Sequence, residues 1–255
     1  VLPNTDPERT TLIIKGSVIP VQRSVAPAYG HTMGTLGLKA VHVPFFEVYT
    51  NKTKVEKIDI INNGKTPLTL EFDKVPRHLD VSVLPETLSP GEKGRILITY
   101  HAERAKDWGI RRDEFWVKLP SSDKPQPQNK ITVSADIQED YSGMTPDQIA
   151  KAPHLEIGND LVDFGTIKGN TAVSKSVSLT NTGVSNLQIR KVNNESQVVS
   201  VSLPQMSIQS GKSIDMKITV RPSKSRSRLL NHRIFIITND PARPTISLPV
   251  VATFE

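Results

Sequence analysis

Hydrophobic and polar residues alternate in many short stretches of this chain. In "KIDIINNG", Ile58 and Ile60 alternate with polar residues, and in "DMKITV", Met216 and Ile218 do the same. A period of two residues is typical of a β-strand that packs one face against a core. Ten apolar residues of the second half are predicted to lie buried between two sheets: Phe164, Ile167, Val177, Leu179, Leu187, Ile189, Met216, Ile218, Ile234 and Ile236.

Turn-forming residues separate these stretches at regular intervals. The segments 62–64 ("NNG") and 181–183 ("NTG") each divide two alternating stretches. We expect them to form equivalent tight turns in which the glycine has a positive φ. Strands spaced about 8 to 12 residues apart over about 100 residues are typical of an antiparallel sandwich of immunoglobulin type. The pattern therefore predicts an all-β protein.

The second half of the chain repeats the first at an offset of 119 residues. The stretch "KIDIINNGKTPLTL" from Lys57 falls on "SVSLTNTGVSNLQI" from Ser176, and Phe45 falls on Phe164. Internal similarity at a fixed offset indicates repeated structural units. We expect tandem immunoglobulin-like sandwiches over residues 38–140 and 155–255.

The segments before and between the repeats differ in sequence pattern from the repeats themselves. Residues 20–37 are predicted to be a linker, and so are residues 141–154. In the second linker, Thr145, Pro146 and Gln148 have the spacing of a capping box with proline at the first helical position. A short helix is therefore expected over residues 146–151.

The opening of the chain resembles its closing strand. "NTDPERTTLIIKGSV" from Asn4 matches "TNDPARPTISLPVVA" from Thr238. We interpret residues 1–19 as the orphan final strand of a truncated upstream repeat. A β-prone segment without its own sheet is ordered most readily by adding to a sheet edge. A monomer is expected, with a possible strand-mediated dimer through residues 10–18.

Composition restricts the function classes. The chain of 255 residues has a hydrophobic content of 36%, a formal net charge of +6 and no cysteine. The absence of cysteine excludes disulfides, thiolate metal sites and cysteine nucleophiles. No apolar stretch approaches the roughly 20 residues of a membrane span, so no transmembrane span is expected. The positive charge permits an anionic partner without requiring one.

The sequence contains no recognisable catalytic motif. Its six histidines lack metal-ligand spacing, and it has no nucleophile elbow, phosphate loop or calcium loop. We therefore predict no catalytic residue, no metal site and no cofactor.

Basic and aromatic residues supply the remaining binding candidates. Five cations without a neighbouring acid are expected in one loop of the second sandwich, where they could bind a polyanion through charged hydrogen bonds: Arg221, Lys224, Arg226, Arg228 and Arg233. Trp108 and Trp116 are the candidates for stacking on a glycan. The scarcity of aromatic residues argues against nucleic acid as a partner.

The second repeat resembles a known family. The stretch "FGTIKGNTAVSKSVSLTNTGVSNLQIRKV" from Phe164, the turn "SIQSGKSIDMKITV" and the closing "ITNDPARPTISLPVVA" are similar to the bacterial domain of unknown function 1573 (DUF 1573). That family is related to the major-sperm-protein and hydin-like immunoglobulin domains, and the resemblance implies a periplasmic or secreted protein. Family members often carry Cys-Gly-Cys where this chain has Asn193 to Ser196, so no thiol or metal role is carried over.

These observations favour a non-enzymatic function. We expect a spacer or binding module of the bacterial envelope, whose signal peptide has been removed and whose partner is an unknown protein or an envelope glycan. One alternative is a glycan-binding or glycan-processing accessory protein that uses Trp108 or Trp116. Another is a cytosolic adaptor of the major-sperm-protein type.

Overall fold

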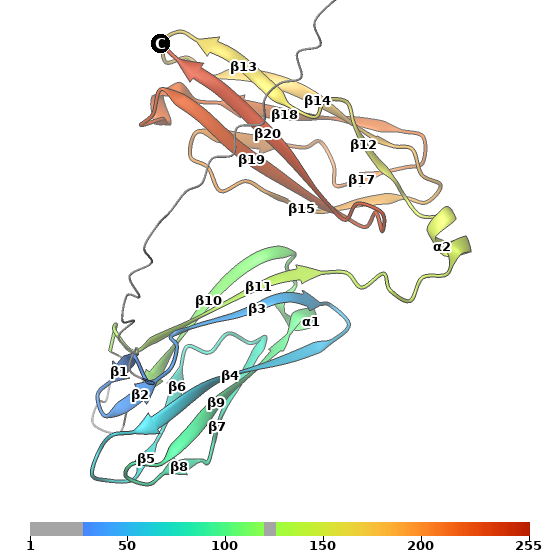
Figure 1. Ribbon diagram of the computed structural model, residues 1–255. Helices are drawn as coiled ribbons and strands as arrows, with labels where there is room; N and C mark the ends of the chain where they lie inside the picture. The colour runs from blue at the N-terminus through green and yellow to red at the C-terminus, as the bar shows by residue number, and fades with distance from the viewer. Residues whose placement is uncertain (1–27, 120–125) are drawn as a thin grey trace, which may run out of the picture.

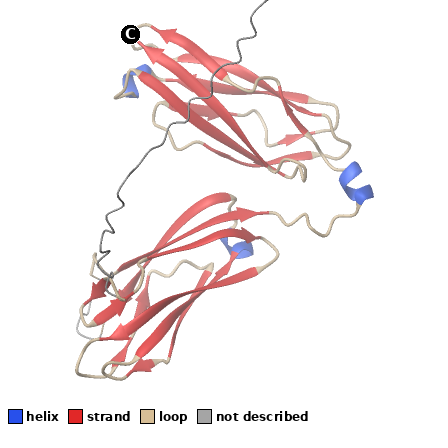
Figure 2. Ribbon diagram, in the orientation of Figure 1, coloured by secondary structure: helices blue, strands red, loops and turns tan. Residues whose placement is uncertain are grey.

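The chain folds into two β-sandwiches joined by a connecting segment (Figures 1 and 2). The computed structural model describes residues 28–119 and 126–255. The predicted all-β fold with tandem sandwiches is confirmed. The predicted orphan strand at residues 1–19 and its pairing through residues 10–18 lie outside the described residues.

The first sandwich packs a five-stranded sheet, in the order β1-β2-β4-β9-β7, against a four-stranded sheet, in the order β3-β11-β10-β6. The strands β5 and β8 form a separate pair. Strand β3 lies at a sheet edge and runs parallel to β11. The elements are β1 (His31–Met33), β2 (Leu36–Leu38), β3 (His42–Tyr49), β4 (Thr53–Asn62), β5 (Leu68–Thr69), β6 (Glu71–Asp73), β7 (Leu79–Leu84), β8 (Thr87–Leu88), β9 (Lys93–His101), α1 (Ala102–Ala105), β10 (Gly109–Lys118) and β11 (Lys130–Gln138).

The second sandwich has the same plan. A four-stranded sheet in the order β12-β14-β18-β16 faces a five-stranded sheet in the order β13-β20-β19-β15-β17. Strand β13 lies at an edge and runs parallel to β20, as β3 does to β11. The elements are β12 (Leu155–Ile157), β13 (Val162–Ile167), β14 (Val173–Asn181), β15 (Leu187–Asn193), β16 (Val199–Ser202), β17 (Ser207–Ile208), β18 (Ser213–Val220), the 3-10 helix η1 (Pro222–Lys224), β19 (Leu229–Thr238) and β20 (Thr245–Phe254).

The first sandwich begins earlier than predicted. The assignment of residues 20–37 to a linker is wrong from residue 31 onward, because β1 and β2 form a hairpin that pairs with β4. Met33, Leu36 and Leu38 are buried in the first core. Two three-residue strands are too short to show a clear alternation, although burial of their apolar side chains stabilises the sheet edge.

Each sandwich has its own apolar core. All ten residues predicted to lie between the sheets of the second sandwich are buried, and the prediction is confirmed. The first core is built in the same way around Phe45, Ile58, Ile96 and Phe115. Alternation predicted these strands correctly because one face of every sheet packs inward.

A buried asparagine organises the equivalent turn of each repeat. The amide nitrogen of Asn62 donates to the carbonyl oxygens of Thr66 (2.8 Å) and Leu88 (3.0 Å). The amide nitrogen of Asn181 donates in the same way to Ser185 (2.8 Å) and Ile208 (2.9 Å). The predicted equivalence of the two turns is confirmed by these matching bonds.

The predicted positive φ at the turn glycines is wrong. Neither Gly64 nor Gly183 is among the described glycines with positive φ. A Cβ atom on Gly183 would lie 2.3 Å from the backbone nitrogen of His154 and 2.4 Å from the carbonyl oxygen of Ala152. Glycine is needed at this position because another segment of backbone approaches it closely.

The connecting segment contains the helix α2 (Pro146–Ala150), which Thr145 and Gln148 cap reciprocally. Its end is fixed to the second sandwich by Asp240, whose side chain is fully buried. The Asp240 carboxylate accepts a hydrogen bond from the backbone nitrogen of Leu155 at 3.0 Å and lies 3.0 Å from Nδ1 of His154. The "NDP" at residues 239–241 therefore holds the entry to β12 in place.

Candidate functional site

The two sandwiches contact each other where β10 begins. Gly109, the first residue of β10, has a φ of +70° and lies against Ile237 of β19. A Cβ atom on Gly109 would lie 2.4 Å from the Cδ1 atom of Ile237. The glycine allows the first sandwich to approach the outer face of the β15–β19 sheet, and we call this contact region the junction.

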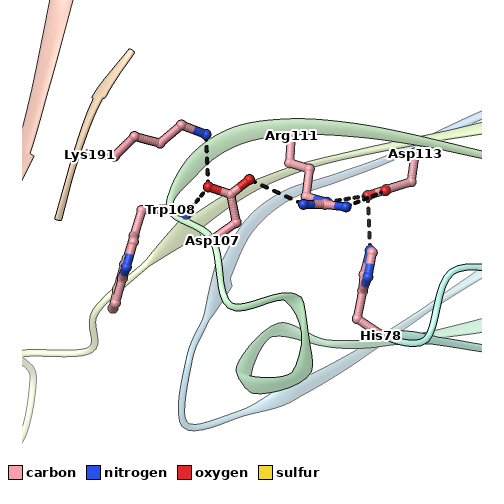
Figure 3. A network of polar contacts seen from close by, with 6 residues as sticks. All are labelled: His78, Asp107, Trp108, Arg111, Asp113 and Lys191. Atoms are coloured by element: carbon pink, nitrogen blue, oxygen red, sulfur yellow. Dashed lines mark hydrogen bonds and ion pairs between the residues drawn. The ribbon is translucent and has the colours of Figure 1, made fainter.

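A chain of polar contacts runs from the first core through the junction to the second sandwich (Figure 3). Nε2 of His78 lies 2.9 Å from Oδ2 of Asp113, and both side chains are buried. Arg111 donates to both oxygens of Asp113, at 2.8 and 2.9 Å, and to Asp107 at 3.2 Å. Nζ of Lys191, on β15, donates to Asp107 at 2.8 Å. Lys191 thus binds the second sandwich to a carboxylate held by the first.

Burial and hydrogen bonding act in opposite directions on the two carboxylates of this chain. Burial raises the pKa of Asp113. Hydrogen bonds and charge from His78 and Arg111 together lower it by more than burial raises it, so the net shift is downward. The pKa of Asp107 is lowered in the same way, against the effect of burial, by Lys191 and by the backbone nitrogen of Trp108. Both groups are therefore charged acceptors at neutral pH.

Arg190 makes a second set of contacts across the junction. Its guanidinium donates to Glu139 at 2.6 Å and lies over the Trp108 ring, 5.1 Å from the ring centroid. The Tyr141 hydroxyl donates to Glu139 and also lies 3.4 Å from the carbonyl oxygen of Thr238. Partly buried ion pairs and cation–π contacts of this kind are stronger than fully exposed ones. The junction therefore fixes the orientation of one sandwich relative to the other.

A groove opens beside the junction, between β10 of the first sandwich and the β15–β19 side of the second. Its volume is about 740 Å³. The first sandwich contributes an apolar and a basic side chain, and the second contributes the rest: Ile110, Arg112, Asn193, Glu195, His232, Arg233 and Phe235. Ile110 is 60% exposed and Phe235 is 37% exposed, so apolar surface faces the solvent here. We call this feature the interdomain groove.

The structure divides the predicted basic cluster into two groups. Arg221, Lys224, Arg226 and Arg228 surround η1 and the start of β19, and all four are exposed. Placing Arg233 in the same loop is wrong, because it lies within β19 and lines the interdomain groove. Among the described residues, none of these five cations forms an ion pair.

The two tryptophans lie beside cations. Trp108 is half-buried at the junction under Arg190. Trp116 is half-buried on β10, with Nζ of Lys74 lying 5.0 Å from its ring centroid. Each ring therefore has one face occupied by a cation, which reduces the surface available for stacking on a sugar.

The described residues contain no cluster of side chains suited to a metal ion. Across residues 28–119 and 126–255, no group of three or more histidine, aspartate or glutamate side chains could hold a metal ion. The His78–Asp113 pair resembles part of a catalytic arrangement, but His78 is only 2% exposed and no substrate reaches it. In the same residues, no helix has the length and apolar character needed to cross a membrane.

Sequence reasoning missed the junction. Asp107 and Lys191 are 84 positions apart, and Glu139 and Arg190 are 51 apart. No local pattern connects such residues, because tertiary packing alone brings them together. The loop "HAERAKDWGIRRDE" did show equal numbers of acids and bases, which is the composition of a charge network, but nothing indicated its partner.

Comparison with known proteins supports the immunoglobulin-like fold. The family described as HYDIN/CFA65/VesB-like, Ig-like domain, matches residues 153–253. No curated protein matches the chain in sequence. A crystal structure of a protein of unknown function from Porphyromonas gingivalis W83 is similar, with 18% identity and a TM-score of 0.61, covering 86% of this chain and 100% of that chain.

Two further similarities are weaker. The Vibrio cholerae VesB protease has 15% identity and a TM-score of 0.32, covering 40% of this chain and 31% of its own. The ASH / PapD-like domain of human CEP192 has 14% identity and a TM-score of 0.33, covering 46% of this chain and 94% of its own. The similarity to the Porphyromonas gingivalis protein shows the fold of the chain and no activity.

Proposed function

We propose that this protein is a non-enzymatic binding module of the bacterial envelope that holds an anionic polymer in the interdomain groove. The observation that carries the proposal is the junction, which places a basic side chain from each sandwich in one groove. Arg112 comes from β10 and Arg233 from β19, and neither forms an ion pair within the described residues. Guanidinium groups bind carboxylates, sulfates and phosphates through paired hydrogen bonds.

The apolar side chains of the groove support the same function. Ile110 and Phe235 expose carbon surface next to the two guanidinium groups. Binding sites usually combine apolar contact area with a few well-placed polar groups. Glu195 also lines the groove, so two arginines and one carboxylate give it a formal charge of +1 with His232 neutral. A polymer with spaced anionic groups and apolar faces fits this combination better than a small, densely charged inorganic anion does.

Comparison of two paired variants tests the proposal. Arg112→Ala with Arg233→Ala removes two positive charges from the groove, and Arg226→Ala with Arg228→Ala removes the same charge from the exposed loop. Binding of polygalacturonate and of heparin is measured by calorimetry at about 20 and 150 mM salt. We expect the groove variant to weaken binding about tenfold or more and the loop variant to weaken it less than about threefold. Equal losses, or a larger loss for the loop variant, would contradict the proposal.

Envelope localisation is part of the proposal and has its own test. It is supported by the resemblance of the second repeat to a periplasmic or secreted family. Fractionation of a tagged full-length protein in its own bacterium should place it in the periplasm or the medium. Recovery with the cytoplasmic fraction would favour the adaptor function instead.

A further inference from the structure

The edge strand β3 presents an aromatic side chain in an unfavourable backbone conformation. Phe46 has a φ of +53° and is 71% exposed. At the offset of 119 residues, Phe46 corresponds to Gly165, which has a φ of +64° at the matching irregularity of β13. Glycine adopts this conformation freely, whereas a bulky residue is strained in it. The first sandwich therefore keeps an exposed aromatic ring at a position where the second sandwich has glycine.

Core packing does not explain why position 46 carries an aromatic side chain. The preceding residue, Phe45, is fully buried and fills the core position that Phe164 fills in the second sandwich. A Cβ atom on Gly165 would meet no atom within 4 Å, so the matching position opens to solvent. Strained residues retained at an exposed position are more frequent at binding sites than elsewhere.

Two carboxylates lie next to Phe46. Glu47 and Asp136 are paired residues on the parallel strands β3 and β11, so like charges stand side by side. Such a pair is destabilising by itself. Asp136 is half-buried, and burial, together with the charge of Glu47, raises its pKa. Within the described residues neither carboxylate forms an ion pair. Neutral groups donate to both: the Tyr49 hydroxyl lies 3.2 Å from Glu47, and the Gln138 amide lies 2.7 Å from Asp136.

These side chains surround a shallow pocket of about 510 Å³ that also includes Lys54. The Lys54 amine is directed at the main chain, where it donates to the carbonyl oxygens of Phe45 at 2.5 Å and Glu47 at 3.3 Å. Those two oxygens already accept hydrogen bonds, which makes this part of the edge less suited to an added β-strand. Side chains supply the free binding groups of the pocket.

We propose that Phe46, Glu47 and Asp136 form a docking site for an arginine or lysine side chain of a partner protein. A guanidinium or ammonium group over the Phe46 ring gains a cation–π contact, and the two carboxylates accept its hydrogen bonds. The cation also relieves the repulsion between Glu47 and Asp136. A neutral sugar could stack on the ring but would leave that repulsion in place.

The partner is a different protein rather than a second copy of this chain. The chain carries a formal net charge of +6, so copies repel each other before they meet. The site is also separate from the interdomain groove, because the two share no lining residue. Failure of one proposal therefore leaves the other standing.

NMR titration tests the docking site with Nα-acetyl-L-argininamide, whose only charge is the guanidinium. The matched control ligand is Nα-acetyl-L-citrullinamide, which has a similar shape and no charge. We expect saturable shifts at residues 46–49 and 136 with the arginine derivative at millimolar concentration, and none with the citrulline derivative. Methyl β-D-glucopyranoside is the third probe, and no shifts are expected with it.

Variants at two positions complete the test. Phe46→Gly removes the ring and restores the residue of the second repeat, so it should fold normally and weaken binding about tenfold. Phe46→Tyr keeps an aromatic face and should retain binding, while Glu47→Gln should weaken it. Absence of saturable shifts, an equal response to citrulline, or preferential binding of the glucoside would overturn the proposal. Self-association that Phe46→Gly abolishes would overturn the choice of a different protein as partner.

Discussion

Gly183 offers a direct test of how the connecting segment packs on the second sandwich. Gly183→Ala adds one carbon atom, which would lie 2.3 Å from the backbone nitrogen of His154, 2.4 Å from the carbonyl oxygen of Ala152 and 2.6 Å from the carbonyl carbon of Pro153. Carbon atoms normally stay about 3.5 Å or more from such neighbours. Because all three atoms belong to the backbone, no side-chain rotation relieves the overlap.

The loss in free energy of unfolding caused by Gly183→Ala follows from the contacts that the displaced turn weakens. The turn is held to the connecting segment by two backbone hydrogen bonds, from Thr182 to His154 at 2.9 Å and from Val184 to Ala152 at 3.1 Å. A shift of the turn weakens both bonds, at about 1 kcal/mol each, and overpacking adds about 1 to 3 kcal/mol. Replacing glycine also stabilises the folded state by about 0.4 to 1 kcal/mol, because it restricts the unfolded chain. We expect a net loss on the order of 3 kcal/mol.

Gly64→Ala is the matched control. At the equivalent turn of the first sandwich, the added carbon would lie 3.0 Å from Oδ1 of Asn62 and 3.1 Å from Cβ of Thr35. Both distances are longer than the three at Gly183, so shifts of a few tenths of an ångström relieve the overlap. The expected loss is about 1 kcal/mol or less.

Thermal unfolding followed with two probes distinguishes the sandwiches. Trp116 lies in the first sandwich away from the junction, so its fluorescence, measured in a Trp108→Phe background because Arg190 covers Trp108, reports on the first sandwich. Far-ultraviolet circular dichroism reports on both sandwiches. For a domain of this size, about 3 kcal/mol corresponds to a decrease in Tm of roughly 10 to 25 °C. Gly183→Ala should lower the transition seen by circular dichroism and affect the fluorescence transition much less. An unchanged Tm, or an equal loss for Gly64→Ala, would refute the close approach of the connecting segment.

Three further predictions concern stability. Leu179→Ala removes a fully buried side chain and should cost about 2 to 5 kcal/mol in chemical denaturation, and a loss below about 1 kcal/mol would contradict its place in the core. Phe46→Gly relieves the positive φ and should stabilise the first sandwich by about 1 kcal/mol, and a clear loss would show that the ring packs against the fold. The lowered pKa of Asp113 means that the folded state binds fewer protons than the unfolded chain. The resulting stability is therefore present above the ordinary pKa of about 3.9 and is lost as the pH falls below it toward the folded pKa. The free energy of unfolding, measured by chemical denaturation between pH 5 and 3, should show this decline. Asp113→Asn should make the decline with pH smaller, and an equal decline in the variant and the unmodified protein would contradict the role of the carboxylate.

The alternation of apolar and polar residues, together with the internal repeat, predicts most of the fold. Ile58 and Leu179 belong to strands whose alternation places one face inward, and the offset of 119 residues revealed the second sandwich. The same offset carries β12 at Leu155–Ile157 onto β2 at Leu36–Leu38, so the start of the first sandwich could have been found from the repeat. It was missed because alternation over three residues is a weak signal.

The candidate sites depend on information that is not local. The repeat alone aligns Phe46 with Gly165 and so identifies an aromatic residue at a position suited to glycine. The junction is different, because Asp107 meets Lys191 only after both sandwiches have formed and docked. The turn glycines show the same limit: a glycine needed for positive φ and one needed for close approach look alike in a sequence.

The central claim is that the junction holds the two sandwiches in one orientation and so creates the interdomain groove. Residual dipolar couplings of the backbone amides, measured by NMR in a weakly aligned sample, test it directly. Couplings from both sandwiches should fit a single alignment tensor with the arrangement seen in Figure 1, and Arg190→Ala with Lys191→Ala should separate them into two tensors. Two tensors of different magnitude in the unmodified protein would show that the sandwiches move independently and would contradict the claim.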